Sequence, residues 1–191
     1  MNKIVMLLAG MFLVAGLSGC LSPSGDTIAE KKATMQKMSD DSLQEFYARF
    51  PALKEKISNA AGYAIFNDFG LQIFLPSTES GWGMVYNKTT GEKTYMKMFS
   101  LGCGFGLGVR DFRALFVLKN QDNIAQLINS GWGLGVQANA VFRFGETGDG
   151  ASAAAEVSPG VTLYKITRNG IALQATVQGN KMWGNDDMNA K

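Results

Sequence analysis

The stretch Leu101-Gly102-Cys103-Gly104-Phe105-Gly106-Leu107-Gly108-Val109 alternates glycine with apolar residues without a break. A period of two is the repeat of a β-strand, so we expect one face of glycine and one apolar face. Residues 131–136 repeat the pattern, with Trp132 among the apolar positions. Glycine costs backbone entropy in a strand, so such a face indicates close contact with another group or sharp bending of the sheet.

The flanking residues extend this strand into a sheet. Period-two or short apolar runs occupy residues 63–66, 81–86 and 94–99, and residues 88–91 have the composition of a turn. Asn169-Gly170 is a strong hairpin signal, which predicts that residues 161–166 pair with residues 171–177.

Two segments have helical spacing instead. The first follows a good start at Ser39-Asp40-Asp41, and Pro51 divides it into two consecutive helices. The second covers residues 120–129, with Asn120 as its cap. The apolar stripe of the first segment contains Leu43, Phe46, Phe50, Leu53 and Ile57.

This N-terminal stripe has two interpretations. It is either an amphipathic segment that inserts into a membrane or a helix packed on the domain core, and we favour the second. The predicted fold class is α+β: a strongly curved, barrel-like antiparallel sheet with N-terminal helices and one internal crossing helix.

The first twenty residues have the pattern of a secretory signal. Lys3 precedes an uncharged stretch from residue 4 to residue 19, which is shorter than the roughly 20 residues of a spanning helix. Leu17-Ser18-Gly19-Cys20 is similar to the bacterial lipobox, which implies cleavage before Cys20 and acylation of its sulfur and amine. The alternative is an ordinary signal, or an uncleaved anchor, with a chance cysteine.

By the same analogy, Leu21 rather than aspartate favours the outer membrane, with the protein facing the periplasm. We therefore expect a signal peptide over residues 1–19, a lipidated tether over residues 20–29, and a single domain over residues 30–191.

Composition excludes several kinds of chemistry. The chain of 191 residues has no histidine, so the usual general base and zinc ligand are missing. Its net charge of +2 offers no electrostatic attraction for nucleic acid. If Cys20 is acylated, Cys103 has no cysteine partner within the chain. We interpret Cys103 as a small buried hydrophobe, with a redox role as the alternative.

No catalytic or cofactor motif is found. The glycines follow a strand period and do not have the spacing of a phosphate loop or dinucleotide site. Asp111 lies between Arg110 and Phe112 and close to Arg113, which favours an ion pair or turn cap over catalysis. Residues 185–189 favour a capped turn over a cation site. We predict a non-enzymatic protein without metal or cofactor.

The ordered motifs resemble the SYLF family of lipid-binding domains over about residues 30–188. They comprise residues 61–66, the glycine-rich residues 104–111, residues 116–120, residues 165–179 and residues 180–184. The resemblance implies one α+β domain with a barrel-like sheet that binds lipid and does not catalyse a reaction. The charges of the N-terminal helices nearly balance, which departs from a basic lipid-binding helix.

Two functions follow as hypotheses. The first is an envelope lipoprotein that contacts phospholipid through acylated Cys20 and through its own surface. The second is a structural or protein-interaction lipoprotein whose glycines serve internal packing and whose protein partner is unknown. The candidate lipid-binding residues are Phe46, Phe50, Lys54, Trp82 and Trp132.

Overall fold

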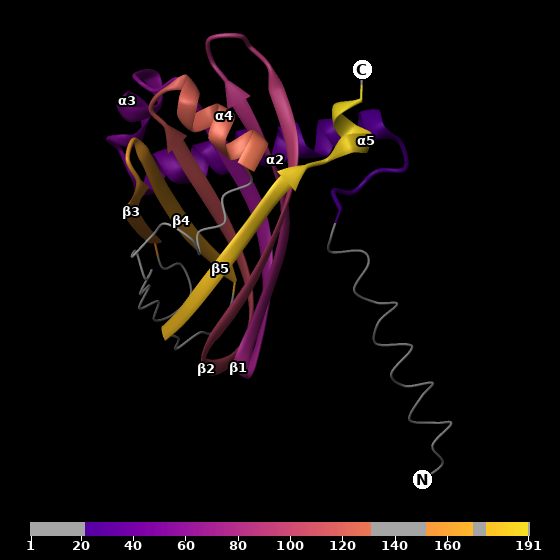
Figure 1. Cartoon of the computed structure of the whole chain (residues 1–191), viewed down its shortest axis with the longest axis vertical. Helices are drawn as coiled ribbons and strands as arrows, with labels where there is room; N and C mark the ends of the chain where they lie inside the picture. Colours follow the sequence, from indigo (N-terminus) through magenta and orange to yellow (C-terminus); the bar gives the residue numbers. More distant parts are fainter. Residues whose placement is uncertain (1–21, 131–151, 170–174, 191) are drawn as a thin grey trace.

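The computed structural model describes residues 22–130, 152–169 and 175–190 (Figure 1). It is an α+β fold with a curled antiparallel sheet, N-terminal helices and one internal helix, as the sequence predicts. The elements in chain order are α2 (Ile28–Arg49), α3 (Leu53–Ser58), β1 (Gly62–Asn87), β2 (Lys93–Leu118), α4 (Gln121–Ser130), β3 (Ser152–Ser158), β4 (Val161–Asn169), β5 (Ala175–Gly184) and α5 (Asp186–Asn189).

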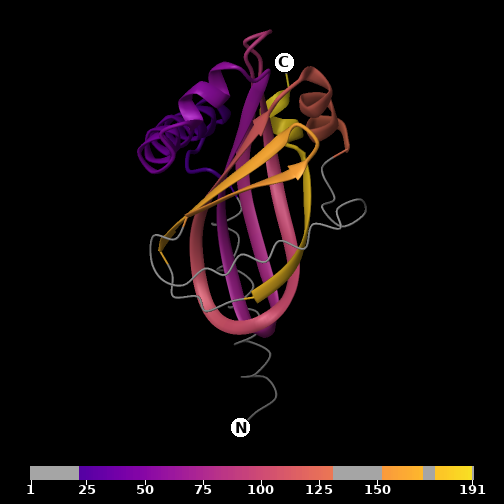
Figure 2. The same ribbon diagram turned by 90° about the vertical axis from the view of Figure 1, so that its left-hand side faces the viewer.

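A long two-stranded ribbon forms the centre of the sheet. β1 and β2 each have 26 residues and pair from Gly62↔Leu118 to Tyr86↔Lys93, with a register shift between Phe74 and Pro76. Figure 2 shows the ribbon bending back in a U at the end away from the helices. The bend brings the two halves of β1 close to each other.

Glycine is required where these halves meet. A Cβ on Gly83 would overlap the carbonyl oxygen of Ile65, and a Cβ on Gly62 would overlap that of Tyr86. A Cβ on Gly81 would overlap the Asp68 side chain. At these three glycines the group approached is the backbone or a side chain of β1 itself. The alternation of residues 101–109 lies within β2, but their side-chain surroundings are outside the described residues.

The predicted hairpin around Asn169-Gly170 is wrong. β4 and β5 both pair antiparallel with β2, at Asp111↔Asn169 and Phe105↔Ala175 respectively. On β2, Phe105 and Asp111 are six residues apart, and their partners Ala175 and Asn169 are also six residues apart. β4 and β5 therefore pair with successive parts of β2, both antiparallel and in the same register. β2 is long enough to pair with both in succession, and the hairpin partner of β4 is β3. The turn between β3 and β4 contains Gly160 at φ +79°.

The sheet has a buried core on each face. We call the face covered by α4 the inner face and the face covered by α2 and α3 the outer face; the two helical layers lie on opposite sides in Figure 2. On β1, Ala64 and Phe66 belong to the inner core, whereas Tyr63 and Ile65 belong to the outer core. Alternate side chains of one strand therefore stabilise two separate layers.

The first helix begins earlier than predicted. α2 starts at Ile28, where the Thr27 side chain accepts a hydrogen bond from the Glu30 backbone N–H and the Glu30 carboxylate accepts one from the Thr27 backbone N–H. This capping box satisfies backbone donors that would otherwise lack partners at the helix start. Ser39, predicted to open the helix, is instead buried in its middle. The break at Pro51 is confirmed, because α2 ends at Arg49 and α3 begins at Leu53.

Two other local predictions are confirmed. The turn after β1 places Gly91 at φ +73°, and the Asn87 side chain accepts hydrogen bonds from the backbone of Thr89 and Thr90. At the start of α4, the Asn120 side chain accepts from the Asn123 backbone at 2.9 Å. Both devices are local, which is why the sequence pattern identifies them.

Candidate functional site

The structure describes four of the six predicted site residues. Phe46 is fully buried on α2, and Trp82 is only 8% exposed on β1. Phe50 packs against the same outer core and meets the Tyr164 ring edge to face, with centroids 5.0 Å apart. Lys54 is exposed on α3. Cys20 and Trp132 lie outside the described residues.

These positions bear on the two interpretations of the N-terminal stripe. Phe46, Leu53 and Ile57 join the sheet residues of the outer core. The interpretation of this stripe as a core-packing surface is confirmed for the described conformation. Phe46 and Trp82 could contact lipid only if α2 moved away from the sheet.

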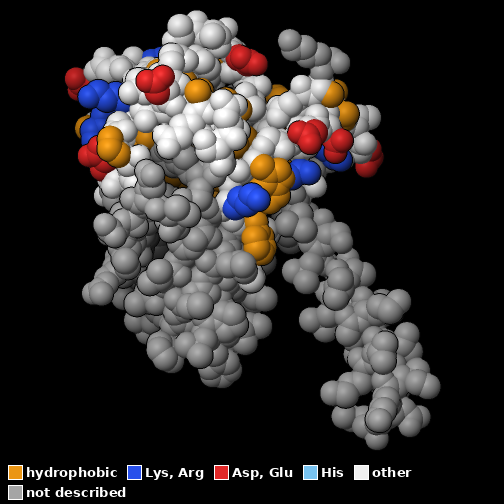
Figure 3. Space-filling view, viewed as in Figure 1, with side chains coloured by type: hydrophobic (Ala, Val, Ile, Leu, Met, Phe, Trp, Pro, Cys, Tyr) orange, Lys and Arg blue, Asp and Glu red, His pale blue; other side chains and the backbone are white. Residues whose placement is uncertain are grey.

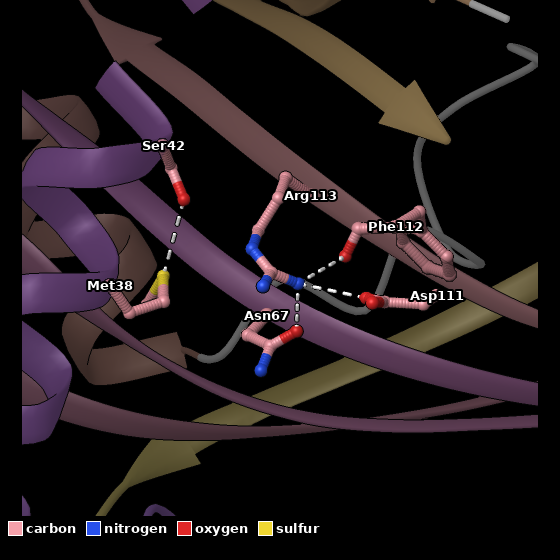
Figure 4. Close-up of polar contacts among 6 residues, drawn as sticks. All are labelled: Met38, Ser42, Asn67, Asp111, Phe112 and Arg113. Atoms are coloured by element: carbon pink, nitrogen blue, oxygen red, sulfur yellow. Dashed lines mark hydrogen bonds and ion pairs between the residues drawn. The ribbon is translucent and has the colours of Figure 1, made fainter. Parts of the chain in front are cut away.

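A polar cluster lies where α2 crosses the sheet. The guanidinium of Arg113 donates hydrogen bonds to Asn67 and to Asp111, the latter at 2.8 Å, while the Arg113 side chain is nearly buried (Figure 4). The neighbouring turn of α2 carries Met38 and Ser42, and the Ser42 hydroxyl donates a hydrogen bond to the Met38 sulfur at 3.5 Å. The ion pair predicted for Asp111 is confirmed. The cluster connects β1 to the part of β2 where the pairing with β4 shifts its register.

Two open grooves border the outer helices. The smaller, of about 230 Å³, lies between α2 and the sheet and includes Thr34, Lys37, Trp82 and Arg113 in its walls. The larger, of about 480 Å³, lies between α3 and the turn joining β3 to β4. Its charged walls include Lys56, Lys119, Glu55 and Glu156, so the charges of both signs are balanced there.

Among the side chains that the structure describes, the aromatic ones most open to solvent lie elsewhere, at the edge of the outer face. Phe99 on β2 is 38% exposed and Trp183 on β5 is 40% exposed. In the register of the sheet, Phe99 pairs with Lys181 and Trp183 pairs with Lys97. We call Lys97, Phe99, Lys181 and Trp183 the β2–β5 patch. Figure 3 shows hydrophobic and basic side chains together over the end of β5.

The segment that precedes α2 is attached to the domain. Pro23 is buried, and the Thr34 hydroxyl donates a hydrogen bond to the Ser24 carbonyl at 2.8 Å. Gly25 has φ +139°, and a Cβ there would lie 2.9 Å from the Lys31 nitrogen. Residues 22–26 therefore turn back along the first turns of α2, and the predicted tether over residues 20–29 is held against the helix over part of its length.

The titration properties of the described residues reflect packing. Burial raises the pKa of Tyr63, Tyr95 and Tyr47 above the ordinary tyrosine value. Two backbone hydrogen bonds at the start of α2 lower the pKa of Glu30. Within the described ranges, no three Cys, Asp or Glu side chains gather closely enough to hold a metal ion. In the part of the chain that the structure describes, no helix has the length and apolar character needed to cross a bilayer.

Comparison with known proteins finds a relative that covers most of the chain. A protein from Aeromonas veronii named Beta cell expansion factor A is 27% identical to this chain over 172 residues. The match covers 90% of this chain and 63% of that protein, so the chain spans less than two thirds of its relative. No protein-family model matches the chain.

Proposed function

We propose that this protein is a membrane-anchored envelope lipoprotein whose domain binds phospholipid without catalysing a reaction, as its resemblance to the SYLF family implies. In this proposal Cys20 is acylated and the protein faces the periplasm from the outer membrane. The 27% identity to Beta cell expansion factor A over most of the chain supports a relationship at the level of the whole domain.

The observation that carries the proposal is that only three residue steps along the chain separate Cys20 from Pro23, the first buried residue that the structure describes. Pro23 is already buried and Ser24 is hydrogen-bonded to α2. Three extended residue steps span only about 10 Å. An acyl anchor on Cys20 would therefore hold the folded surface near the lipid headgroups. A flexible linker of many residues would not impose such proximity.

A non-catalytic role agrees with the arrangement of the charged groups. The nearly buried Arg113 is held by Asp111 and Asn67, a set of contacts that joins strands. The tyrosines whose pKa is raised by burial are distributed over the outer core and α2. None of these residues forms a nucleophile and base pair of the kind that an acyl-transfer or hydrolytic mechanism requires.

Vesicle co-sedimentation tests the proposal. The mature chain from residue 20, carrying Cys20→Ser, is mixed with vesicles of phosphatidylethanolamine and phosphatidylglycerol, and with vesicles of phosphatidylcholine. We expect the unacylated protein to pellet with the vesicles that contain phosphatidylglycerol. If it stays in the supernatant with every lipid, the domain does not bind membrane by itself and the lipid-binding proposal is rejected.

A second candidate function is a structural or protein-interaction lipoprotein. The observation that favours it is that Gly62, Gly81 and Gly83 use their missing side chains for contacts inside β1. Glycine-rich strands of this kind need no lipid to explain them. A protein recovered by crosslinking in intact cells, together with failure to pellet with vesicles, would support this alternative.

A further inference from the structure

The outer face of the sheet is only partly covered by helices. Met84 and Tyr95 form one row across β1 and β2, and both are buried. The next row contains Trp82 on β1, Lys97 on β2 and Trp183 on β5, and only Trp82 is buried. Beyond it, Phe99 and Lys181 are exposed. The boundary of the covered area therefore passes through the row that contains Lys97.

The β2–β5 patch combines the two side-chain types that favour a membrane interface. Trp183 and Phe99 offer apolar rings, and indole is typical of the headgroup level because it also carries an N–H donor. Lys97 and Lys181 lie directly opposite them in the register. Their long apolar stems can cover neighbouring rings while the ammonium groups reach phosphate. Exposed rings with no basic neighbours would instead suggest a protein contact.

The patch lies close to the start of α2. The Lys32 ammonium is 5.4 Å from the centre of the Tyr95 ring. Tyr95 and Lys97 are two residues apart on the same face of β2, a step of about 7 Å along a strand. In the sequence, Cys20 comes two residues before the described segment 22–26, which is attached to this helix. An anchor at Cys20 would therefore tether the domain at the end of α2 that lies nearest the patch.

The end of β5 is fixed in this position by α5. The Asn189 side chain accepts a hydrogen bond from the Tyr95 backbone N–H and donates one to the Tyr95 carbonyl, both at 2.8 Å. The Asn185 backbone N–H donates to the same carbonyl at 2.9 Å. These bonds hold Trp183 beside Lys97 on a rigid edge. Asp186 and Asp187 are exposed on α5, so the surroundings of the patch are not uniformly basic.

We propose that Lys97, Phe99, Lys181 and Trp183 form a contact surface for the headgroups of anionic phospholipids in a bilayer. The proposal rests on the proposed lipid-binding function and names the surface through which it operates. The rings enter the headgroup region and the two ammonium groups bind lipid phosphates. Because Asp186 and Asp187 are exposed on the adjoining α5, we expect both the basic side chains and the apolar rings to contribute to binding.

The first test locates tryptophan in the anchored protein. The full acylated chain is reconstituted in vesicles that contain phosphatidylglycerol and a phospholipid brominated on its acyl chains, and tryptophan fluorescence is recorded. The chain has three tryptophans, so single replacements assign the signal. We expect bromine quenching that is mostly lost in Trp183→Phe and retained in Trp82→Phe. Quenching that is unchanged by Trp183→Phe, or absent altogether, would overturn the proposal.

The second test measures binding without the anchor. In the mature Cys20→Ser chain, Lys97→Gln with Lys181→Gln should weaken partitioning to phosphatidylglycerol vesicles by about fivefold for each lysine. Phe99→Ser with Trp183→Ser should weaken it on the order of tenfold or more. The matched control is Lys93→Gln with Lys119→Gln, which removes the same charge from exposed positions outside the patch and outside the candidate lipid-binding residues.

The outcomes separate this proposal from the function on which it rests. If the parent chain binds and both patch variants bind as well as the control, the domain uses another surface and only the patch is rejected. If the parent chain binds no vesicle, the proposed function itself fails. Near-ultraviolet circular dichroism of each variant, unchanged from the parent, shows that lost binding reflects the surface and not the fold.

Discussion

Trp82 and Trp183 occupy the same row of the sheet, one on each side of Lys97, yet their environments differ. Trp82 is 8% exposed beside α2, whereas Trp183 is 40% exposed at the open edge. Both residues lie on strands, and both are followed by glycine. Their difference comes from which part of the outer face the N-terminal helix covers.

This comparison assigns different roles to similar side chains. Trp82 belongs to the outer core with Met84 and Tyr95 and contributes to stability. Trp183 buries less of its surface, so its apolar area remains available to a partner. An exposed ring supported by a rigid edge can be substituted with little effect on folding, which makes the two residues a natural experimental pair.

The largest expected effect is on stability, from Trp82→Ala. Removing a large buried ring typically costs about 3–5 kcal/mol, because the lost contacts and the cavity both destabilise the fold. Trp183→Ala should change the free energy of unfolding by much less, about 0.5–1 kcal/mol, since the ring is half solvated. Urea unfolding followed by far-ultraviolet circular dichroism gives both values. Equal losses for the two variants would contradict the division of the outer face into a covered and an open part.

A smaller effect is expected at the start of α2. Thr27→Ala removes the side-chain acceptor for the Glu30 backbone N–H and should destabilise the protein by about 1 kcal/mol. The first turns of α2 should also loosen, which would raise acrylamide quenching of tryptophan fluorescence at Trp82 in a variant carrying Trp132→Phe and Trp183→Phe. Thr27→Ser, which keeps the hydroxyl, is the matched control. If the start of α2 does not depend on the capping box, Thr27→Ala and Thr27→Ser will show the same free energy of unfolding and the same acrylamide quenching.

Local chemistry explains which parts of the fold the sequence predicts. The Asn87–Gly91 turn, the Asn120 cap and the Pro51 break each depend on a few adjacent residues, and each is confirmed. The start of α2 at Ile28 could also have been predicted from the sequence, because Thr27-Ile28-Ala29-Glu30 is a capping-box pattern. The acidic residues after Ser39 gave a competing signal, although Ser39 proved to be buried within the helix.

Long-range pairing explains the rest. Asn169-Gly170 has a hairpin composition, but β4 and β5 pair in succession with the 26-residue β2. Likewise, the exposure of Trp183 and the burial of Trp82 depend on where α2 crosses the outer face. A pattern of alternating residues distinguishes the two faces of a strand without showing how far along it a helix extends. The candidate site was therefore less predictable than the fold class.

The smallest expected effect concerns pH and the covered part of the outer face. Burial raises the pKa of Tyr63, so the folded protein retains the phenolic proton to a higher pH than the unfolded chain. Above the ordinary tyrosine pKa of about 10, ionisation therefore favours the unfolded chain, and stability falls as the pH rises toward the raised value. Tyr63→Phe removes this contribution, so its free energy of unfolding should decrease less than that of the parent between about pH 9 and 11. Tyr95→Phe should act in the same direction, because burial raises that pKa as well. Urea unfolding at each pH measures the difference in the free energy of unfolding. If the free energies of Tyr63→Phe and of the parent fall in parallel as the pH rises, the Tyr63 ring is as accessible to water as the open edge around Trp183.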